Sequence, residues 1–288
     1  MAKERVGFIG IGVMGNSMAK HILKAGYPLT VYSRTKEKCQ EILSNGAQWA
    51  ESPKALAQVS DIIITMVGFP SDVEEIYLGE DGLIESAHKG AYLIDMTTSA
   101  PTLAKGLYEQ GKTKGIHILD APVSGGDIGA KNATLAIMVG GDEKDYQRLQ
   151  PLFETMGSNI VYQGKAGAGQ HTKLSNQIAI ASNMIGVCEA IVYAQKAGLD
   201  PEQVLKSIST GAAGSFSLTN LAPRMLKGDF EPGFYIKHFI KDLKIALQES
   251  ERLGLDFPGL ALAKSLYEDL AQQGEENSGT QALYKRWM

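Results

Sequence analysis

Hydrophobic residues follow two different patterns along the chain, one before and one after about residue 164. Before it, short runs rich in β-branched residues alternate with amphipathic stretches at helical spacing. The runs are apolar at nearly every position, which is typical of parallel strands buried on both faces. The predicted strands are Val6–Ile9, Leu29–Tyr32, Ile62–Met66, Tyr92–Asp95, His117–Asp120 and Ala136–Val139, with helices at Met14–Ala25, Lys36–Ser44 and Ala100–Lys114. This alternation predicts a doubly wound α/β sheet domain over residues 1–163.

The second pattern, over residues 164–288, predicts an all-α domain. Gly169–Gly198 is expected to form one helix roughly 45 Å long at the standard rise per residue. An apolar stripe recurs along it every three or four residues, which favours burial against other helices, at Leu174, Ile178, Ala181, Ile185, Cys188 and Val192. Further helices are predicted at Glu202–Ser209, Asn220–Leu226, Ile236–Leu253 and Pro258–Gln273. A long helix therefore joins the sheet domain to the helical domain.

The composition excludes several classes of protein. The 288 residues are 44% hydrophobic and 21% charged, as in ordinary globular proteins, and the net charge of -4 argues against nucleic-acid binding. Cys39 and Cys188 fall in apolar helical patterns and are expected to be buried thiols in a reducing compartment. The five histidines lack ligand spacing, so no metal is expected. No signal peptide is visible and no segment is expected to be long enough to span a membrane, which predicts a cytoplasmic protein.

A glycine-rich loop follows the first predicted strand directly and opens the first helix. Three glycines in this position serve a tight turn, close approach to a pyrophosphate and close packing of helix on sheet. The helix N-terminus adds amide donors for phosphate. A tight strand-to-helix turn is the alternative. The context favours a dinucleotide in a Rossmann domain, bound by Gly10, Ile11, Gly12, Val13, Met14 and Gly15.

The end of the second strand bears on which dinucleotide is bound. NAD sites place an acid there for the ribose 2′-hydroxyl, whereas this chain has Ser33, Arg34 and Thr35. Two hydroxyls and a guanidinium suit a 2′-phosphate, so NADP is favoured over NAD. Stacking of Arg34 on the adenine is the alternative.

Two further features mark candidate chemistry. The strand ending at Asp120 runs into Ala121–Gly126, whose small residues leave backbone amides accessible to an anion. Later, Lys173, Asn176 and Gln177 share one helix face by their spacing, and this face is expected to oppose the apolar stripe. A solvated lysine is the ordinary explanation, but beside two glycines such a trio suits a cleft in which an ammonium donates a proton.

These motifs together resemble the β-hydroxyacid dehydrogenases. That family includes 3-hydroxyisobutyrate dehydrogenase, tartronate semialdehyde reductase and the succinic semialdehyde/glyoxylate reductases, with 6-phosphogluconate dehydrogenase more distant. The resemblance extends from Gly7 to beyond Leu243. It rests on the glycine loop, Asp120–Gly126 with Gly129-Ala130 and Thr134-Leu135, the Lys173 helix, and Lys241-Asp242-Leu243.

The resemblance implies an oxidoreductase that moves a hydride between NAD(P)(H) and a small carboxylate-bearing hydroxyacid or semialdehyde. Lys173 would be the general acid/base, with Asn176 near the reacting oxygen, and Lys241 would approach the nicotinamide. The substrate carboxylate would bind to Ser124, Gly125 and Gly126. Further cofactor contacts would come from Val67, Gly68, Asp72 and Thr98.

The chain also departs from the family pattern. Asn176-Gln177 stands where 3-hydroxyisobutyrate dehydrogenases carry two Asn, and Ala133 replaces a usual Gly before Thr134. An imine reductase on the same scaffold and a non-catalytic dinucleotide-binding protein are the competing interpretations. The Lys173 trio argues against a non-catalytic protein. The presence of both a lysine and a carboxylate anchor argues against an imine reductase. A homo-oligomer, dimer or tetramer, is expected from the apolar helical domain.

Overall fold

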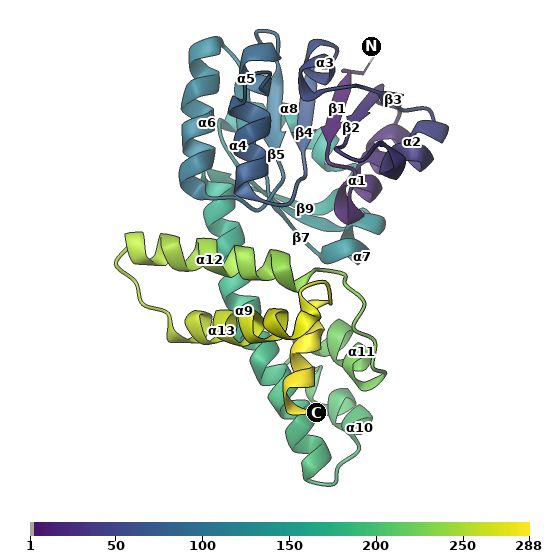
Figure 1. Cartoon of the computed structure of the whole chain (residues 1–288), viewed down its shortest axis with the longest axis vertical. Coiled ribbons are helices and arrows are strands. Elements are labelled where there is room, and N and C mark those ends of the chain that lie inside the picture. The colour runs from purple at the N-terminus through teal and green to yellow at the C-terminus, as the bar shows by residue number, and fades with distance from the viewer. Residues whose placement is uncertain (1–2) are drawn as a thin grey trace. The chain divides into compact units, whose positions relative to one another are not determined.

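The computed structural model describes residues 3–288, which form two compact units (Figure 1). The first unit ends at Lys173 and the second is Leu174–Met288. This division falls within the long helix α9 (Ala168–Lys196), whereas the change of sequence pattern falls just before it. The first turn of α9 therefore belongs to the sheet unit.

The first unit is built on a sheet with strand order β3-β2-β1-β4-β5-β6-β8-β7, in which β9 pairs with β8. The strands are β1 Val6–Ile9, β2 Leu29–Tyr32, β3 Gln48–Trp49, β4 Ile62–Thr65, β5 Tyr92–Asp95, β6 His117–Asp120, β7 Val123–Ser124, β8 Leu135–Gly140 and β9 Gly157–Gly164. The strands from β3 to β6 are parallel. Their carboxyl ends meet at one edge, since Ile9, Thr65, Asp95 and Asp120 are in register.

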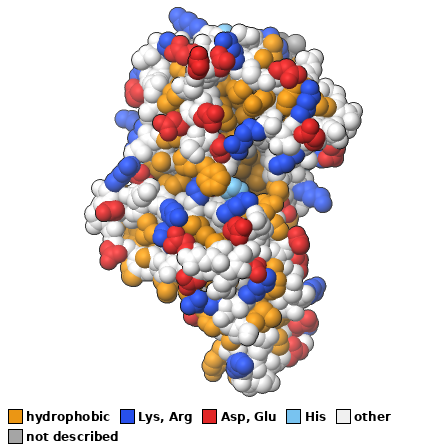
Figure 2. Space-filling model, viewed as in Figure 1, with side chains coloured by type: hydrophobic (Ala, Val, Ile, Leu, Met, Phe, Trp, Pro, Cys, Tyr) orange, Lys and Arg blue, Asp and Glu red, His pale blue; other side chains and the backbone are white. Residues whose placement is uncertain are grey.

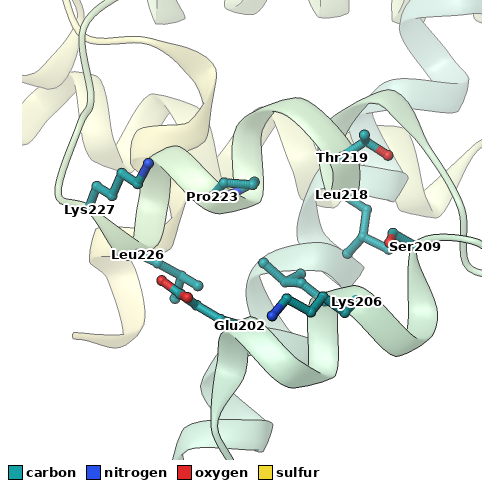
Figure 3. A pocket seen from close by; sticks show the side chains of 9 residues that line it. Glu202, Lys206, Ser209, Leu218, Thr219, Pro223, Leu226 and Lys227 are labelled. Carbon is teal, nitrogen blue, oxygen red and sulfur yellow. The ribbon is translucent and has the colours of Figure 1, made fainter.

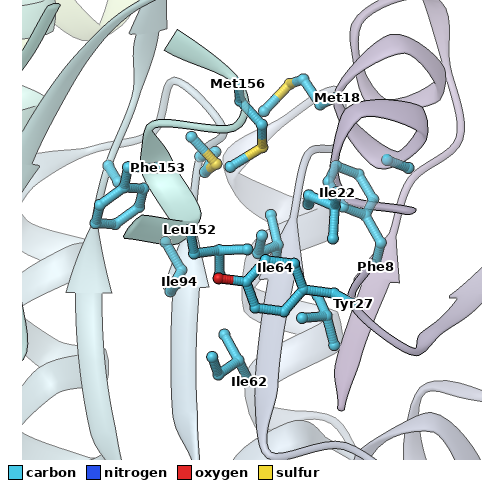
Figure 4. Packing of buried hydrophobic residues seen from close by; sticks show 14 of the residues in the cluster. Phe8, Met18, Ile22, Tyr27, Ile62, Ile64, Ile94, Leu152, Phe153 and Met156 are labelled. Carbon is cyan, nitrogen blue, oxygen red and sulfur yellow. The ribbon is translucent and has the colours of Figure 1, made fainter. Parts of the chain in front are cut away.

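Helices cover both faces of this sheet, and alternate residues of each strand serve them. Ile62 and Ile64 join the core beneath α1 and α8, while Ile63 joins the core beneath α3 to α6. Figure 4 shows Leu152 and Phe153 of α8 packed on the first of these cores. The helices are α1 Val13–Lys24, η1 Lys36–Cys39, α2 Gln40–Ser44, α3 Pro53–Gln58, α4 Pro70–Leu78, α5 Leu83–Ser86, α6 Pro101–Lys114, α7 Gly126–Lys131 and α8 Glu143–Phe153. The predicted doubly wound domain is confirmed.

The last strands differ from the predicted all-parallel sheet. β8 runs antiparallel to β6 and to β7, and only its pairing with β9 is parallel. Three strands were missed: β3 and β7 have two residues each, and β9 is rich in polar residues and glycine and has only Gly157 buried. An edge strand needs no apolar run, because one of its sides meets solvent.

The second unit is helical, as predicted. After α9 come α10 Pro201–Ile208, η2 Ser217–Leu221, α11 Ala222–Leu226, α12 Ile236–Arg252, α13 Pro258–Leu270, η3 Ala271–Glu275 and η4 Thr280–Trp287. α12 and α13 pack against each other, and the rings of Phe239 and Tyr267 meet edge to face at 5.0 Å between centroids. Segments η2 and η3 are π-helical, so the predicted Asn220–Leu226 and Pro258–Gln273 helices each contain a change of helix type.

Helix α9 corrects two expectations. With 29 residues and a window of mean hydropathy 1.4, it is long and apolar enough to cross a membrane, although 39% of that window is buried here and core helices pass the same test. Its predicted apolar stripe is also only partly confirmed: Leu174, Ala181 and Cys188 are buried, whereas Ile178, Ile185 and Val192 are only half-buried. The buried residues include Gln170, Lys173, Leu174, Gln177, Ala181, Met184, Cys188 and Ile191. Two of the polar trio, Lys173 and Gln177, are therefore on the buried face rather than opposite it, and Asn176 is half-buried.

Candidate active site

The glycine loop is shaped by three different constraints. Gly10 has φ +102°, and a Cβ there would lie 2.2 Å from the Met66 carbonyl oxygen. A Cβ on Gly15 would lie 1.9 Å from the Gly10 carbonyl oxygen, so this glycine lets α1 pack closely on the loop. Gly12 differs, because it has an ordinary φ of -95° and no atom within 4 Å of its Cβ position. The fold itself therefore demands glycine at 10 and 15 but not at 12.

The open space at Gly12 fits a dinucleotide pyrophosphate. Gly12 is the N-cap of α1 and makes no side-chain cap, and the first turn of α1 contains no acid. The first N–H groups of α1 and its dipole therefore favour an anion at this point. Around the loop, Ile11 is buried, Met14 packs on the core and Val13 is 49% exposed. These residues fit NAD(P) with a Gly12 backbone that a phosphate can approach closely.

Arg34 is oriented by an acid from another loop. Its Nη1 lies 3.0 Å from Oδ1 of Asp72, whose Oδ2 accepts a hydrogen bond from the Phe69 N–H at 3.0 Å. Asp72 thus caps the first turn of α4 while holding the guanidinium, which is itself 77% exposed. The neighbouring Ser33 is half-buried and Thr35 is exposed. The structure brings the predicted residues Arg34 and Asp72 together, although they follow different strands.

Hydrogen bonds join the ends of β4 and β5 and the loops that follow them. The Val67 N–H donates to Thr97 Oγ1 at 3.0 Å, and the Thr97 N–H donates to Asp95 Oδ1 at 3.0 Å. Thr65 Oγ1 donates to the same Asp95 oxygen at 2.9 Å. Burial raises the pKa of Asp95 to about 6, and the hydrogen bonds from Thr97 and Thr65 oppose that rise. The predicted residues Val67, Gly68 and Thr98 flank this network and are half-buried.

Asp120 binds the beginning of α9. Its Oδ1 accepts the Gly167 N–H at 2.7 Å, and its Oδ2 accepts the Gln170 N–H at 2.8 Å. Burial raises the pKa of Asp120, while these backbone donors oppose the rise. The end of β6 and the first turn of the helix that carries Lys173 are thereby fixed to each other.

The predicted anion loop begins directly after this acid. Gly125 and Gly126 have φ of +131° and +63°, conformations that favour glycine, and Ser124 beside them is half-buried. Ala133, which replaces a usual glycine, has φ 54°. Ala133 therefore has a left-handed backbone conformation, which is strained for a residue with a Cβ atom.

Lys173 lies one turn after Gln170 on α9 and is 7% exposed. In the second unit, Asn176 Nδ2 donates to Gln177 Oε1 at 2.8 Å, and Gln177 Nε2 donates to Asp242 Oδ2 at 2.6 Å. Lys241 Nζ in turn lies 3.0 Å from Asp242 Oδ1. The Asn176-Gln177 pair, which departs from two consecutive Asn, thus links α9 to the Lys241 position on α12.

Four residues that matter to this geometry were not among the predicted site residues. These are Asp95, Asp120, Gln170 and Asp242, buried polar residues that hydrogen-bond to other elements. Asp120 and Asp242 stood inside recognised motifs, and Asp95 and Asp120 both end apolar strands. An acid at the end of a buried strand was therefore the available signal, whereas Gln170 gave none.

The second unit also carries a surface groove between α10 and α11 (Figure 3). Leu205, Leu218 and Leu226 form its apolar part, and Lys206 and Lys227 flank it. None of the residues that line it is a predicted site residue.

Figure 2 shows acidic and basic side chains intermixed over the face in view. Among residues 3–288 no group of three or more His, Cys, Asp or Glu is placed to hold a metal ion.

Comparison with known proteins agrees with this arrangement. The chain matches the family model for the NAD binding domain of 6-phosphogluconate dehydrogenase over residues 5–164. It matches the model for the NAD-binding region of NADP-dependent 3-hydroxyisobutyrate dehydrogenase over residues 167–287. These matches and the geometry define an NAD(P)-dependent oxidoreductase.

Individual relatives cover nearly the whole chain. It is 65% identical over 286 residues to the uncharacterized oxidoreductase YkwC of Bacillus subtilis (strain 168), covering 99% of each protein. It is 41% identical over 279 residues to 2-hydroxy-3-oxopropionate reductase of Escherichia coli (strain K12), covering 97% of this chain and 95% of that one. A Mycobacterium tuberculosis 3-hydroxyisobutyrate dehydrogenase structure with L-serine superposes with TM-score 0.89 at 28% identity, covering 99% of both. The chain belongs to the 3-hydroxyisobutyrate dehydrogenase (β-hydroxyacid dehydrogenase) family.

Proposed function

We propose that the protein interconverts a small semialdehyde carrying a carboxylate and the corresponding hydroxyacid, with Lys173 as general acid/base and NADP as cofactor. The observation that carries the proposal is Lys173, buried on the helix whose first turn Asp120 fixes to the carboxyl edge of the sheet. The 2-hydroxy-3-oxopropionate reductase relative supports a substrate of this class.

NAD(P)H, held by the Gly10–Gly15 loop and Arg34, would supply a hydride to the substrate. The Lys173 ammonium donates its proton to the carbonyl oxygen, which becomes the hydroxyl, and the neutral amine regains a proton from solvent. Ser124, Gly125 and Gly126 bind the substrate carboxylate through a hydroxyl and backbone amides. In the oxidative direction Lys173 removes the hydroxyl proton. Asn176 is proposed to bind near the reacting oxygen, and Lys241 near the nicotinamide.

Oxidation of NADPH should be followed with succinic semialdehyde, glyoxylate, tartronate semialdehyde and methylmalonate semialdehyde. Propionaldehyde, which lacks the carboxylate, is the matched control, and a cyclic imine tests the competing function. We expect turnover of at least one acid and at least 10-fold lower kcat/KM for propionaldehyde, because a carboxylate anchor fixes the carbonyl in position. Turnover of the imine alone would contradict the proposal, as would equal use of propionaldehyde.

The Arg34→Ala variant tests the choice of NADP. If Arg34 binds the 2′-phosphate, its loss should raise the KM for NADPH by roughly 10–100-fold, the value of a hydrogen bond between charged groups, and leave the KM for NADH within about 2-fold. Lys36→Ala is the matched control, since Lys36 is a nearby exposed cation paired with Glu51. Equal effects of Arg34→Ala on both cofactors would mean that Arg34 binds a part they share.

We also propose a homo-oligomer, dimer or tetramer, in the cytoplasm. Support for association comes from large apolar side chains exposed on the second unit. These are Tyr193, Leu199, Leu253 and Leu262, each at least 53% exposed. A second copy covering them would remove apolar surface from water.

A further inference from the structure

We infer that Gln170 is a positioning residue for Lys173, holding the start of α9 against the loop that follows β5. The inference rests on the proposed role of Lys173 and adds a residue to which neither motif nor family description gives a role. Gln170 is 0% exposed and precedes Lys173 by three residues on the same helix face.

Both ends of the Gln170 carboxamide are used. Its Oε1 accepts the Ser99 N–H at 2.9 Å, and its Nε2 donates to the Thr97 carbonyl oxygen at 2.8 Å. The loop therefore presents one acceptor and one donor, two residues apart, and a carboxamide satisfies both. A glutamate offers two acceptors, and an apolar side chain of similar size offers neither partner. This complementarity identifies the function of the side chain as joining the helix to the loop.

The backbone of the same residue binds a second strand end. The Gln170 N–H donates to Asp120 Oδ2, so one residue connects the exits of β5 and β6. Thr97 extends the connection to the exit of β4, because its Oγ1 accepts the Val67 N–H. The helix also approaches very closely here: a Cβ on Gly169 would lie 2.3 Å from the Met138 carbonyl oxygen and 2.7 Å from that of Asp120.

These bonds tie together two parts of the proposed reaction. Thr98, a proposed cofactor contact, lies between the two loop residues that Gln170 binds. Lys173 lies one turn further along the rigid helix. A single buried carboxamide therefore sets the register between a loop on the cofactor side and the proton donor. Because displacement of a reacting group by about 1 Å can cost roughly 100-fold in rate, loss of this register should appear in kcat.

Gln170→Glu is the most informative variant, since it nearly preserves shape. A carboxylate keeps the bond from Ser99 but sets an oxygen against the Thr97 carbonyl. We expect kcat to fall about 10–100-fold, with the dissociation constant of NADPH, measured by fluorescence titration, within about 3-fold of wild type. Gln170→Leu, which removes both bonds, should lower kcat at least as far.

A double-mutant cycle with Lys173→Ala separates positioning from general support of the fold. If Gln170 acts through Lys173, Gln170→Glu should cost less than about 3-fold in the Lys173→Ala background, because the group it positions is gone. Ser60→Ala is the matched control. Ser60 is also fully buried in the first unit and donates to the Leu56 carbonyl at 2.7 Å, but it lies before β4, at the opposite edge of the sheet. Its loss should lower thermal stability and leave kcat unchanged.

Each result decides the inference. Equal losses of kcat from Gln170→Glu in both backgrounds, or no loss in either, would overturn the positioning role while leaving the proposed function intact. A Lys173→Ala enzyme with wild-type kcat would instead overturn the proposed function, and the inference with it. The kcat of the Lys173→Ala single variant therefore distinguishes these two failures.

Discussion

The Lys173→Ala enzyme is expected to reduce its semialdehyde roughly 10²–10⁴-fold more slowly than wild type, the usual contribution of a positioned general acid. In the proposed reaction, loss of the ammonium would leave the carbonyl oxygen to take its proton from water. The loss should fall on kcat, and NADPH affinity should stay within about 3-fold, because the glycine loop and Arg34 lie on other elements. Lys173 is 7% exposed, so Lys173→Met, which fills the same space, guards against an effect of the void alone.

Steady-state kinetics with each aldehyde that the wild type reduces, together with NADPH titration, measures this. Lys165→Ala is the matched control, because Lys165 is an exposed lysine in the turn just before α9. It should keep wild-type kcat. Added ethylamine is expected to restore part of the rate of Lys173→Ala but not of Lys173→Met, whose side chain occupies the space. A Lys173→Met enzyme with wild-type kcat would exclude Lys173 as the proton donor.

Much of the fold was predictable because each buried parallel strand consists almost entirely of consecutive apolar residues. Four strands were predicted with the bounds that the structure shows, namely Val6–Ile9, Leu29–Tyr32, Tyr92–Asp95 and His117–Asp120. The reversal at β8 was not predictable in this way. Strand direction depends on the connection and on pairing partners, and an apolar run is the same in either direction.

The misplaced face of α9 shows a different limit. The spacing predicted that Lys173, Asn176 and Gln177 form a polar face opposite the apolar stripe, because polar residues usually lie in solvent. In the structure Gln170 and Gln177 are buried, and their carboxamides find partners on the β5 loop and on α12. A pattern of residue types cannot show which polar groups will be satisfied inside the fold, since the partners are distant in sequence.

In the candidate site, too, local features were predictable and contacts between distant residues were not. Glycines in loops with fixed local geometry were recognisable, because Gly10, Gly125 and Gly126 have positive φ and Gly15 has no room for a Cβ. Contacts between loops were not. The pairing of Arg34 with Asp72 and of Gln170 with the β5 loop arises only when parallel strands bring their carboxyl ends to one edge.

Gly12→Ala is expected to fold as well as wild type and to bind NADPH roughly 10–100-fold more weakly. The Cβ position of Gly12 has no protein atom within 4 Å, and its φ of -95° suits alanine, so the fold loses nothing. The added methyl would instead hold a pyrophosphate away from the first N–H groups of α1, and each weakened charge-assisted hydrogen bond costs about 1.5–3 kcal/mol. Fluorescence titration with NADPH and thermal unfolding without cofactor measure the two effects separately.

Two other glycine variants serve as controls for Gly12→Ala. Gly15→Ala places a Cβ 1.9 Å from the Gly10 carbonyl oxygen and should lower the unfolding temperature as well as the affinity. Gly106→Ala, exposed within α6 with nothing within 4 Å, should leave affinity unchanged and stabilise the helix by about 0.5–1 kcal/mol. If Gly12→Ala bound NADPH as wild type does, the pyrophosphate would lie elsewhere. Because the protein has no packing reason for glycine at this position, an affinity loss without a stability loss would identify the ligand as what fills the space.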